Sequence, residues 1–215
     1  MTNRELPTTA YITLGLLASR DWSAYQLAEQ VGRGVDQLWP RAERQRYNTL
    51  KRLVADGLVA TRSEHAGKRP RTMYSLTPAG RDELGQWLAT TAAPPALEFE
   101  GMVRVLMSDH GSIDDLRRTL EEMRADAAAK RALFAEHAAY ISATGGTFPE
   151  RRHLFGLANT FMIGHFDHII GWATWALAQI ERWPDTVAPA ADDAQVRELL
   201  AAGLRAGEPP RPPGA

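Results

Sequence analysis

Cysteine is absent from this chain of 215 residues. Disulfide bonds, thiolate metal sites and cysteine nucleophiles are therefore excluded. No apolar run approaches the roughly 20 residues that span a bilayer. The first residues, MTNRELPTTAY, also lack the basic start and apolar core of a signal peptide. These absences predict a cytoplasmic protein without a membrane partner.

The formal net charge of −1 conceals an uneven distribution of charge. Residues 41–71 contain nine basic and three acidic side chains, whereas residues 93–215 contain 12 basic and 17 acidic ones. Such an asymmetry favours a surface for a polyanion in one part of the chain and a different task in the other. A hydrated charged surface is the alternative explanation.

The first ninety residues predict three helices, a β-hairpin and a fourth helix. Helices are expected over about 8–19, 24–31, 40–56 and 78–90, and the hairpin strands over 58–64 and 71–76. Thr8 or Thr9 is expected to cap the first helix, and Ser23 with Gln26 to form a capping box for the second. This order is that of a winged helix-turn-helix, in which one helix enters the DNA major groove and the hairpin lies on the backbone or minor groove.

Basic and amide side chains gather on the third predicted helix and at the tip of the hairpin, within EHAGKRPRTMYSLT (64–77). Cations at the tip would lie against phosphates and release counterions. On the helix, arginine suits guanine and asparagine or glutamine suits adenine, whereas the remaining polar side chains suit phosphates. The predicted DNA-binding residues are Arg44, Gln45, Tyr47, Asn48, Lys51, Arg52, Lys68, Arg69 and Arg71. An amphipathic helix with a hydrated face is the alternative, and the basic hairpin favours double-stranded DNA.

Three segments closely resemble the PadR family of transcriptional regulators: AYITLGLLASRDWSAYQLAEQV, RYNTLKRLVADGLVATR and GKRPRTMYSLTPAGRDEL. The family pattern has a Tyr-x-x-Leu-x-Arg-Leu helix ending in Gly-Leu, and a basic wing before Tyr-x-Leu-Thr-x-x-Gly. The matching residues are Tyr47, Leu50, Arg52, Leu53, Gly57, Leu58, Tyr74, Leu76, Thr77 and Gly80. Ala24 stands where the family commonly has glycine. The resemblance implies a winged helix that binds DNA.

The Pro-rich connector at 92–96 separates a predicted DNA-binding domain, residues 1–92, from a helical remainder. Helices are expected over about 97–108, 113–143, 149–183 and 193–204, with Ser112 and Asp115 as a capping pair. Residues 97–183 resemble the C-terminal region of PadR proteins related to virulence activators. Residues 184–215 are predicted to be a partly disordered Pro- and Ala-rich tail with one short helix.

The predicted helix over 149–183 is apolar around nearly its whole circumference. A helix without a hydrated face must be buried within a bundle or between subunits. Because this half has few other helices, we predict burial against a second copy of the chain. The fold class is therefore mainly α: an N-terminal winged helix-turn-helix with one two-stranded β-hairpin, and a C-terminal helical dimerisation domain over 97–183.

One line along this helix consists of Phe161, His165, His168, Trp172 and Trp175. Aromatic rings with titratable groups suit a pocket for an aromatic or planar small-molecule effector, and aromatic core packing is the alternative. The family resemblance implies that effectors sit near the helical dimer interface. A metal site is a further hypothesis, in which His153 or His137 completes the ligands His165 and His168. The sequence contains no other element of a metal-enzyme signature.

These patterns predict a sequence-specific transcriptional repressor that binds a palindromic operator as a homodimer and is released when an effector shifts its conformational equilibrium. No catalytic residue, metal site or cofactor is predicted. Two alternatives remain: a small-molecule-binding helical dimer with vestigial DNA binding, and a His-based metal-dependent enzyme. A winged helix used only for protein contacts is disfavoured, because protein interfaces are depleted in lysine.

Overall fold

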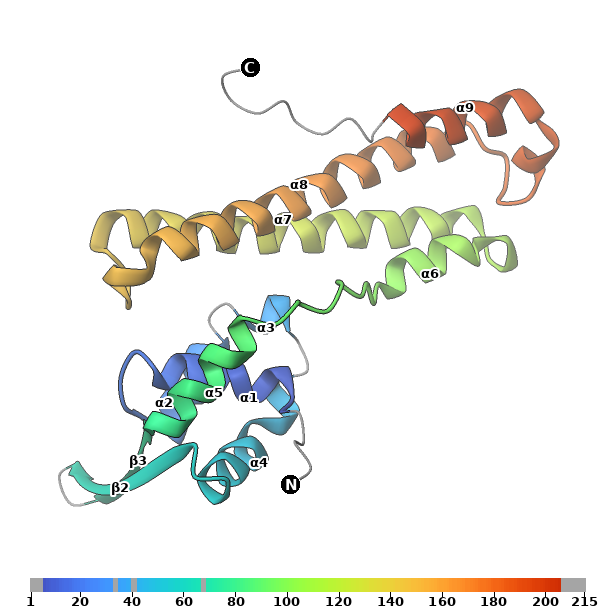
Figure 1. Ribbon diagram of the computed structural model, residues 1–215. Coiled ribbons are helices and arrows are strands. Elements are labelled where there is room, and N and C mark those ends of the chain that lie inside the picture. The colour runs from blue at the N-terminus through green and yellow to red at the C-terminus, as the bar shows by residue number, and fades with distance from the viewer. Residues whose placement is uncertain (1–5, 33–34, 40–41, 67–68, 206–215) are drawn as a thin grey trace. The chain divides into compact units, whose positions relative to one another are not determined.

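The computed structural model divides the chain into two compact units, Met1–Pro95 and Ala96–Ala215 (Figure 1). It describes residues 6–32, 35–39, 42–66 and 69–205. Side chains are described for all of these except 36–37, 42–47, 65–66, 69–70 and 204–205. No helix within this described part is long and apolar enough to cross a membrane.

The first unit is a helical bundle with a small antiparallel sheet. Its elements are α1 (Thr8–Leu17), β1 (Trp22–Ser23), α2 (Ala24–Gly32), α3 (Val35–Leu38), α4 (Ala42–Ala55), β2 (Val59–Ala66), β3 (Arg69–Leu76) and α5 (Pro78–Leu88). The strand order is β1-β3-β2, and β2 pairs with β3 from Val59 opposite Leu76 to Ala66 opposite Arg69. The predicted winged helix-turn-helix is thereby confirmed.

Three local details differ from the sequence-based expectations. The hairpin gains a third, two-residue strand, β1, which pairs with β3 through Trp22 and Tyr74. A short additional helix, α3, precedes the helix expected over 40–56, which is α4 and is described over Ala42–Ala55. Neither Thr8 nor Thr9 caps α1, because both lie inside it: the N-cap is Pro7, which makes no side-chain cap hydrogen bond.

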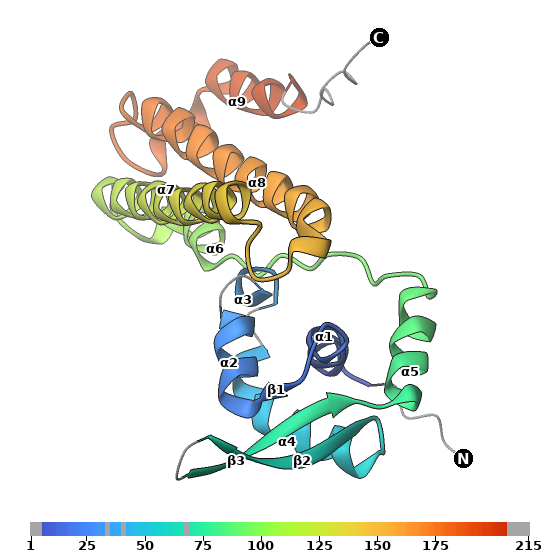
Figure 2. The ribbon, with the colours of Figure 1, turned by 90° about the vertical axis from the view of Figure 1, so that its left-hand side faces the viewer.

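Helix α1 lies at the centre of the first unit, in contact with α4, α5 and β3 (Figure 2). Leu14 of α1 and Leu53 of α4 are completely buried. The ring of Tyr11 stacks on Trp87 of α5 with centroids 4.6 Å apart, and its hydroxyl donates to the Glu83 carboxylate at 2.9 Å. Burial of large apolar side chains contributes about 1.5–3 kcal/mol each, so this core holds α4 and the hairpin in a defined relation.

The junction between α4, the hairpin and α5 depends on two glycines of the family pattern. Gly57 ends α4 with φ 73°, a left-handed conformation that glycine adopts without strain. Gly80 packs so closely that a Cβ would lie 2.1 Å from the carbonyl oxygen of Leu58. The Thr77 hydroxyl caps α5 by accepting from the Gly80 amide at 3.0 Å and also donates to the Gly57 carbonyl at 2.9 Å. These contacts attach the β2–β3 hairpin, hereafter the wing, to the end of α4.

The second unit is helical throughout its described residues. Its elements are α6 (Glu100–Leu106), η1 (Ser108–His110), α7 (Ile113–Thr144), η2 (Pro149–Arg151), α8 (Arg152–Ile180), η3 (Ala188–Ala191) and α9 (Asp193–Arg205). Helices α7 and α8 lie side by side (Figure 1). The predicted pair of Ser112 and Asp115 forms a complete capping box at the start of α7. The last ten residues of the predicted tail lie outside the described part.

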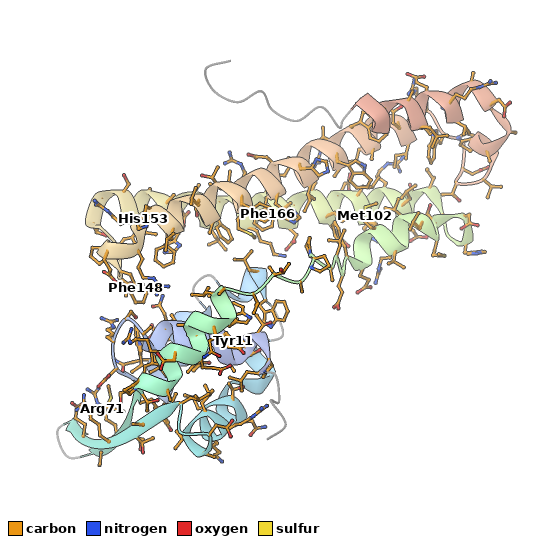
Figure 3. The ribbon with its side chains drawn as sticks, in the orientation of Figure 1. Tyr11, Arg71, Met102, Phe148, His153 and Phe166 are labelled. Atoms are coloured by element: carbon orange, nitrogen blue, oxygen red, sulfur yellow. The ribbon has the colours of Figure 1, made fainter. Side chains whose placement is uncertain are left out.

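The space between α7 and α8 is filled by two apolar clusters. One contains Leu116 and Leu120 of α7 with Ala176 and Ile180 of α8. The other contains Ala127 with Met162 and Phe166, and Phe134 packs against it (Figure 3). An ion pair between Arg131 and Asp167 adds a polar link between the two helices. One face of α8 is thus buried against α7, which leaves its other apolar side chains uncovered within a single chain.

Candidate nucleic-acid interface

Helix α4 presents two of the predicted DNA-binding side chains to solvent. Asn48 and Lys51 are both exposed, and their spacing of three residues places them on one face of the helix. Arg52 is half-buried and forms an ion pair with Asp56 at 3.4 Å, one turn later. Three further predicted residues lie in α4 by their backbone, but their side chains are outside the described part: Arg44, Gln45 and Tyr47.

The wing presents one predicted cation, Arg71, whose side chain is exposed on β3 (Figure 3). The strand register places it opposite Glu64 of β2. Its Nε and Nη2 both donate to Oε2 of Glu64, at 3.1 and 2.8 Å. Lys68 lies outside the described residues, as does the side chain of Arg69 on β3. Of the three cations predicted at the tip, Arg71 is therefore the one whose side-chain contacts lie in the described part.

A second wing cation, Arg62 of β2, was missed by the sequence analysis. Its Nη1 donates to Glu64 at 3.1 Å, and its Nε and Nη2 donate to Asp21 at 3.3 and 3.2 Å. The hydrogen bonds that this guanidinium donates to Asp21 and then to Glu64 raise its pKa above its ordinary value. The alternation of a strand puts residues 62 and 64 on the same face, which was the signal available in the sequence. The contact with Asp21, 41 residues away, had no such signal.

Arg62 and Arg71 are thus both paired with carboxylates of their own chain. The hydrogen bond from Arg71 is the main reason that the pKa of Glu64 lies below its ordinary value. The two arginines are exposed and their carboxylate partners are half-exposed, so water and salt screen the pairs and DNA phosphates can compete for the same guanidinium groups. A phosphate that takes the place of one of these carboxylates would therefore have to break an existing ion pair.

The five residues predicted for an effector lie along α8 without enclosing a site in one chain. Phe161 and His165 stack at 6.5 Å between ring centroids, and Phe161 is 67% exposed. His168 is exposed and Trp175 is 38% exposed. Trp172 instead packs against the cluster of Leu116, Leu120, Ala176 and Ile180. Core packing therefore accounts for Trp172, while the other four side chains remain available on the surface.

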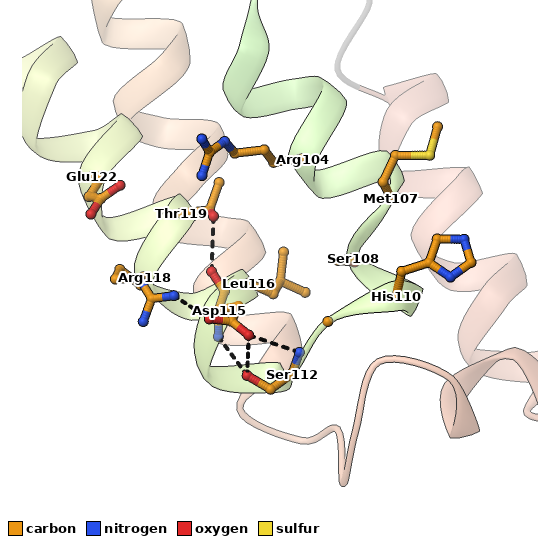
Figure 4. A pocket seen from close by; sticks show the side chains of 11 residues that line it. Arg104, Met107, Ser108, His110, Ser112, Asp115, Leu116, Arg118, Thr119 and Glu122 are labelled. Atoms are coloured by element: carbon orange, nitrogen blue, oxygen red, sulfur yellow. Dashed lines mark hydrogen bonds and ion pairs between the residues drawn. The ribbon is translucent and has the colours of Figure 1, made fainter.

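A cavity of about 310 Å³ lies elsewhere in this unit, between α6, η1 and the start of α7 (Figure 4). Its cations are already partnered, because Arg104 pairs with Glu100 and Arg118 pairs with Asp115. Asp115 also accepts from the Ser112 hydroxyl and amide, which are the main causes that lower its pKa to about 2. Two polar groups of this cavity, Ser112 and Asp115, therefore serve to begin α7.

The histidines considered for a metal site do not gather into one. Within the ranges that the structure describes, no group of three or more His, Asp or Glu side chains is placed to hold a metal ion. His165 is instead in contact with two rings of its own helix, Phe161 and Phe166.

A helical bundle with an antiparallel hairpin between α4 and α5, and with amide and lysine side chains exposed on α4, defines a winged helix-turn-helix protein. Residues 13–86 match the transcriptional regulator PadR-like family. This segment is therefore a PadR-like domain, as its sequence motifs predicted.

Known proteins are similar to this segment in sequence and to the chain in fold. The negative transcriptional regulator PadR of Bacillus subtilis is 34% identical over 79 residues, which are 36% of this chain and 43% of that protein. The match thus spans less than half of that relative. The crystal structure of Bacillus subtilis PadR in complex with operator DNA has a TM-score of 0.73 at 23% identity, covering 82% of this chain and 99% of that one. The same protein in complex with p-coumaric acid has a TM-score of 0.65 at 22% identity, covering 82% and 100%.

Proposed function

We propose that this chain binds double-stranded DNA through α4 and the β2–β3 wing and regulates transcription. The observation that carries the proposal is a PadR-like segment, residues 13–86, with Asn48 and Lys51 exposed on α4 and Arg71 exposed on the wing. The fold shared with Bacillus subtilis PadR, which has been crystallised with operator DNA, supports it.

The two ends of this surface have different chemical tasks. Asn48 has a donor and an acceptor at the spacing of an adenine edge, so it suits base recognition. Lys51 and Arg71 are cations that suit phosphates and give affinity for DNA of any sequence. The remaining members of the proposed interface are Arg44, Gln45, Tyr47, Arg52, Lys68 and Arg69.

We further propose that the protein acts as a homodimer on a palindromic operator. Helix α8 exposes large apolar side chains on the side turned away from α7, including Leu157 at 72% and Phe161 at 67%. Removing such side chains from water is favourable, and a second copy of α8 offers the same apolar surface. A two-fold symmetric dimer matches a DNA site with two-fold sequence symmetry.

The proposed direction of control is repression, with release by a small aromatic molecule at the four exposed members of the predicted line, Phe161, His165, His168 and Trp175. The name of the Bacillus subtilis relative, a negative regulator, and its complex with p-coumaric acid support this choice.

Titration with p-coumaric acid as the first probe should quench tryptophan fluorescence and release DNA. His165→Ala should weaken both effects and His153→Ala, on the same helix but outside the line, should not. Equal responses in the two variants would contradict the assignment.

DNA binding is tested with the duplex upstream of the protein's own gene. We expect affinity to fall steeply with salt, since each neutralised phosphate contributes a slope of about −0.9 in log K against log salt. Lys51→Ala should weaken binding to every duplex, whereas Asn48→Ala should change which sequences are preferred. Lys130→Ala, a matched lysine of the other unit, should bind as the wild type does. Wild-type affinity that is independent of salt would refute the proposal.

A further inference from the structure

Four charged side chains of alternating sign form a continuous ladder on the wing. Asp21 accepts two hydrogen bonds from Arg62, which also donates to Oε1 of Glu64 at 3.1 Å. The other carboxylate oxygen of Glu64 accepts two hydrogen bonds from Arg71, at 3.1 and 2.8 Å. Glu64 is therefore the one acid of this ladder that holds both arginines.

The backbone of the sheet sets this arrangement. Glu64 lies directly opposite Arg71 in the antiparallel register of β2 and β3, where side chains of opposite charge interact favourably. Arg62 stands two residues before Glu64 on the same strand and so shares its face. Pairing of Trp22 with Tyr74 brings Asp21, the preceding residue, to the edge of the sheet. The register thus presents both arginines to one carboxylate.

The two arginines depend on Glu64 to different degrees. Arg62 keeps two hydrogen bonds to Asp21 even without Glu64. The hydrogen bonds of Arg71 on the described wing both end on a single oxygen of Glu64. Removal of the Glu64 charge would consequently release Arg71 while Arg62 stays in place.

We propose that Glu64 is a positioning residue: in the free protein it accepts the hydrogen bonds of Arg71 that a DNA phosphate would otherwise accept. Glu64 thereby limits the affinity of the wing for DNA. The inference rests on the proposed function. Carboxylate and phosphate oxygens both accept paired guanidinium hydrogen bonds, so a DNA phosphate that binds Nε and Nη2 of Arg71 must displace Glu64. Because phosphates occur in every duplex, this competition weakens binding to operator and random DNA by the same factor.

The substitution Glu64→Gln tests this competition, because it keeps the size of the side chain and removes its charge. Binding is measured against a random-sequence duplex and against a duplex that the wild type selects from a random pool. We expect both affinities to rise about three- to tenfold at low salt, with a salt slope steeper by about one phosphate. Glu64→Asp, which retains the charge, should keep a salt slope close to that of the wild type.

Two controls separate the local role of Glu64 from general electrostatics. Asp82→Asn removes one negative charge from an exposed position of α5, and its affinity should change less than that of Glu64→Gln. In an Arg71→Ala background, Glu64→Gln should lose its effect. Equal gains in Glu64→Gln and Asp82→Asn, or a gain that persists without Arg71, would overturn the proposed competition.

The same titrations distinguish the two levels of the proposal. If the wild type binds neither duplex at low salt, the DNA-binding function itself is wrong. If the wild type binds both and Glu64→Gln binds no more tightly, only the role of Glu64 is wrong. Thermal unfolding of each variant verifies that the compared proteins are folded.

Discussion

Gly80 shows how a single position of the family pattern constrains the wing. Its α-carbon faces the backbone carbonyl of Leu58, the residue that leads from α4 into β2. The neighbouring cap of Thr77 ties the same junction through hydrogen bonds to Gly80 and Gly57. The glycine of Tyr-x-Leu-Thr-x-x-Gly is therefore required by close packing.

Substitution of this glycine should destabilise the first unit. In Gly80→Ala the new Cβ would lie 2.1 Å from the Leu58 carbonyl oxygen, so the backbone must shift. We expect the free energy of unfolding in urea to fall by about 1–3 kcal/mol, the usual cost of overpacking. Gly85→Ala on the same helix has no atom within 4 Å of its Cβ and should raise stability by up to about 1 kcal/mol. Loss of equal size in both variants would refute the packing explanation.

At the scale of the element, the start of α7 is defined by reciprocal hydrogen bonds. The Ser112 hydroxyl accepts from the Asp115 amide at 3.1 Å, and the Asp115 carboxylate accepts from the Ser112 amide at 3.1 Å. Asp115 also pairs with Arg118. The hydrogen bonds that the carboxylate accepts from the Ser112 hydroxyl and then from the Ser112 amide favour its ionised form and lower its pKa from 3.8 to about 2.

The capping box should make α7 sensitive to acid in a narrow range. Because the folded pKa of Asp115 is depressed, its contribution to stability is present above about pH 4 and is lost as pH falls toward 2. Ser112→Ala should lower the free energy of unfolding by about 1 kcal/mol at neutral pH. It should also return the pKa of Asp115, measured by NMR titration, toward 3.8. Asp114→Asn, which removes a charge from the same turn without touching the cap, should leave that titration low. An unchanged Asp115 titration in Ser112→Ala would contradict the assigned cause.

At the scale of the whole molecule, the outward side of α8 determines how the proposed dimer would form. Phe161→Glu and Leu157→Glu change side chains that are exposed in one chain, so the fold of the protomer should survive. In a dimer interface each substitution should weaken association by about 2 kcal/mol or more. Sedimentation equilibrium should then show a shift from dimer to monomer, with weaker binding to a palindromic duplex.

A control for this experiment is Leu88→Glu, which alters a leucine of α5 that is 69% exposed. It introduces the same charge on the other unit and should leave the mass of the protein unchanged. A wild-type protein that sediments as a monomer at all concentrations would exclude the proposed homodimer.

Much of the architecture was determined by local sequence. The capping boxes of Ser23 with Gln26 and of Ser112 with Asp115 form as predicted, because their partners are three residues apart and depend on no other element. The hairpin and the helical state of α7 and α8 likewise follow from local sequence patterns, whereas the packing of α8 on α7 was not predicted. The exposure of Asn48 and Lys51 follows from the same helical periodicity.

Tertiary structure decided what depends on residues distant in the chain. The strand β1 exists because Trp22 meets Tyr74, and Arg62 reaches Asp21 only after that pairing. Packing of α8 on α7 assigns Trp172 to the core and leaves Phe161 exposed. The choice of Glu64 as the partner of Arg71 follows from strand register. These contacts join residues that are not separated by the regular spacing of a helix or a strand. The sequence pattern therefore does not indicate them, and only the folded chain brings the residues together.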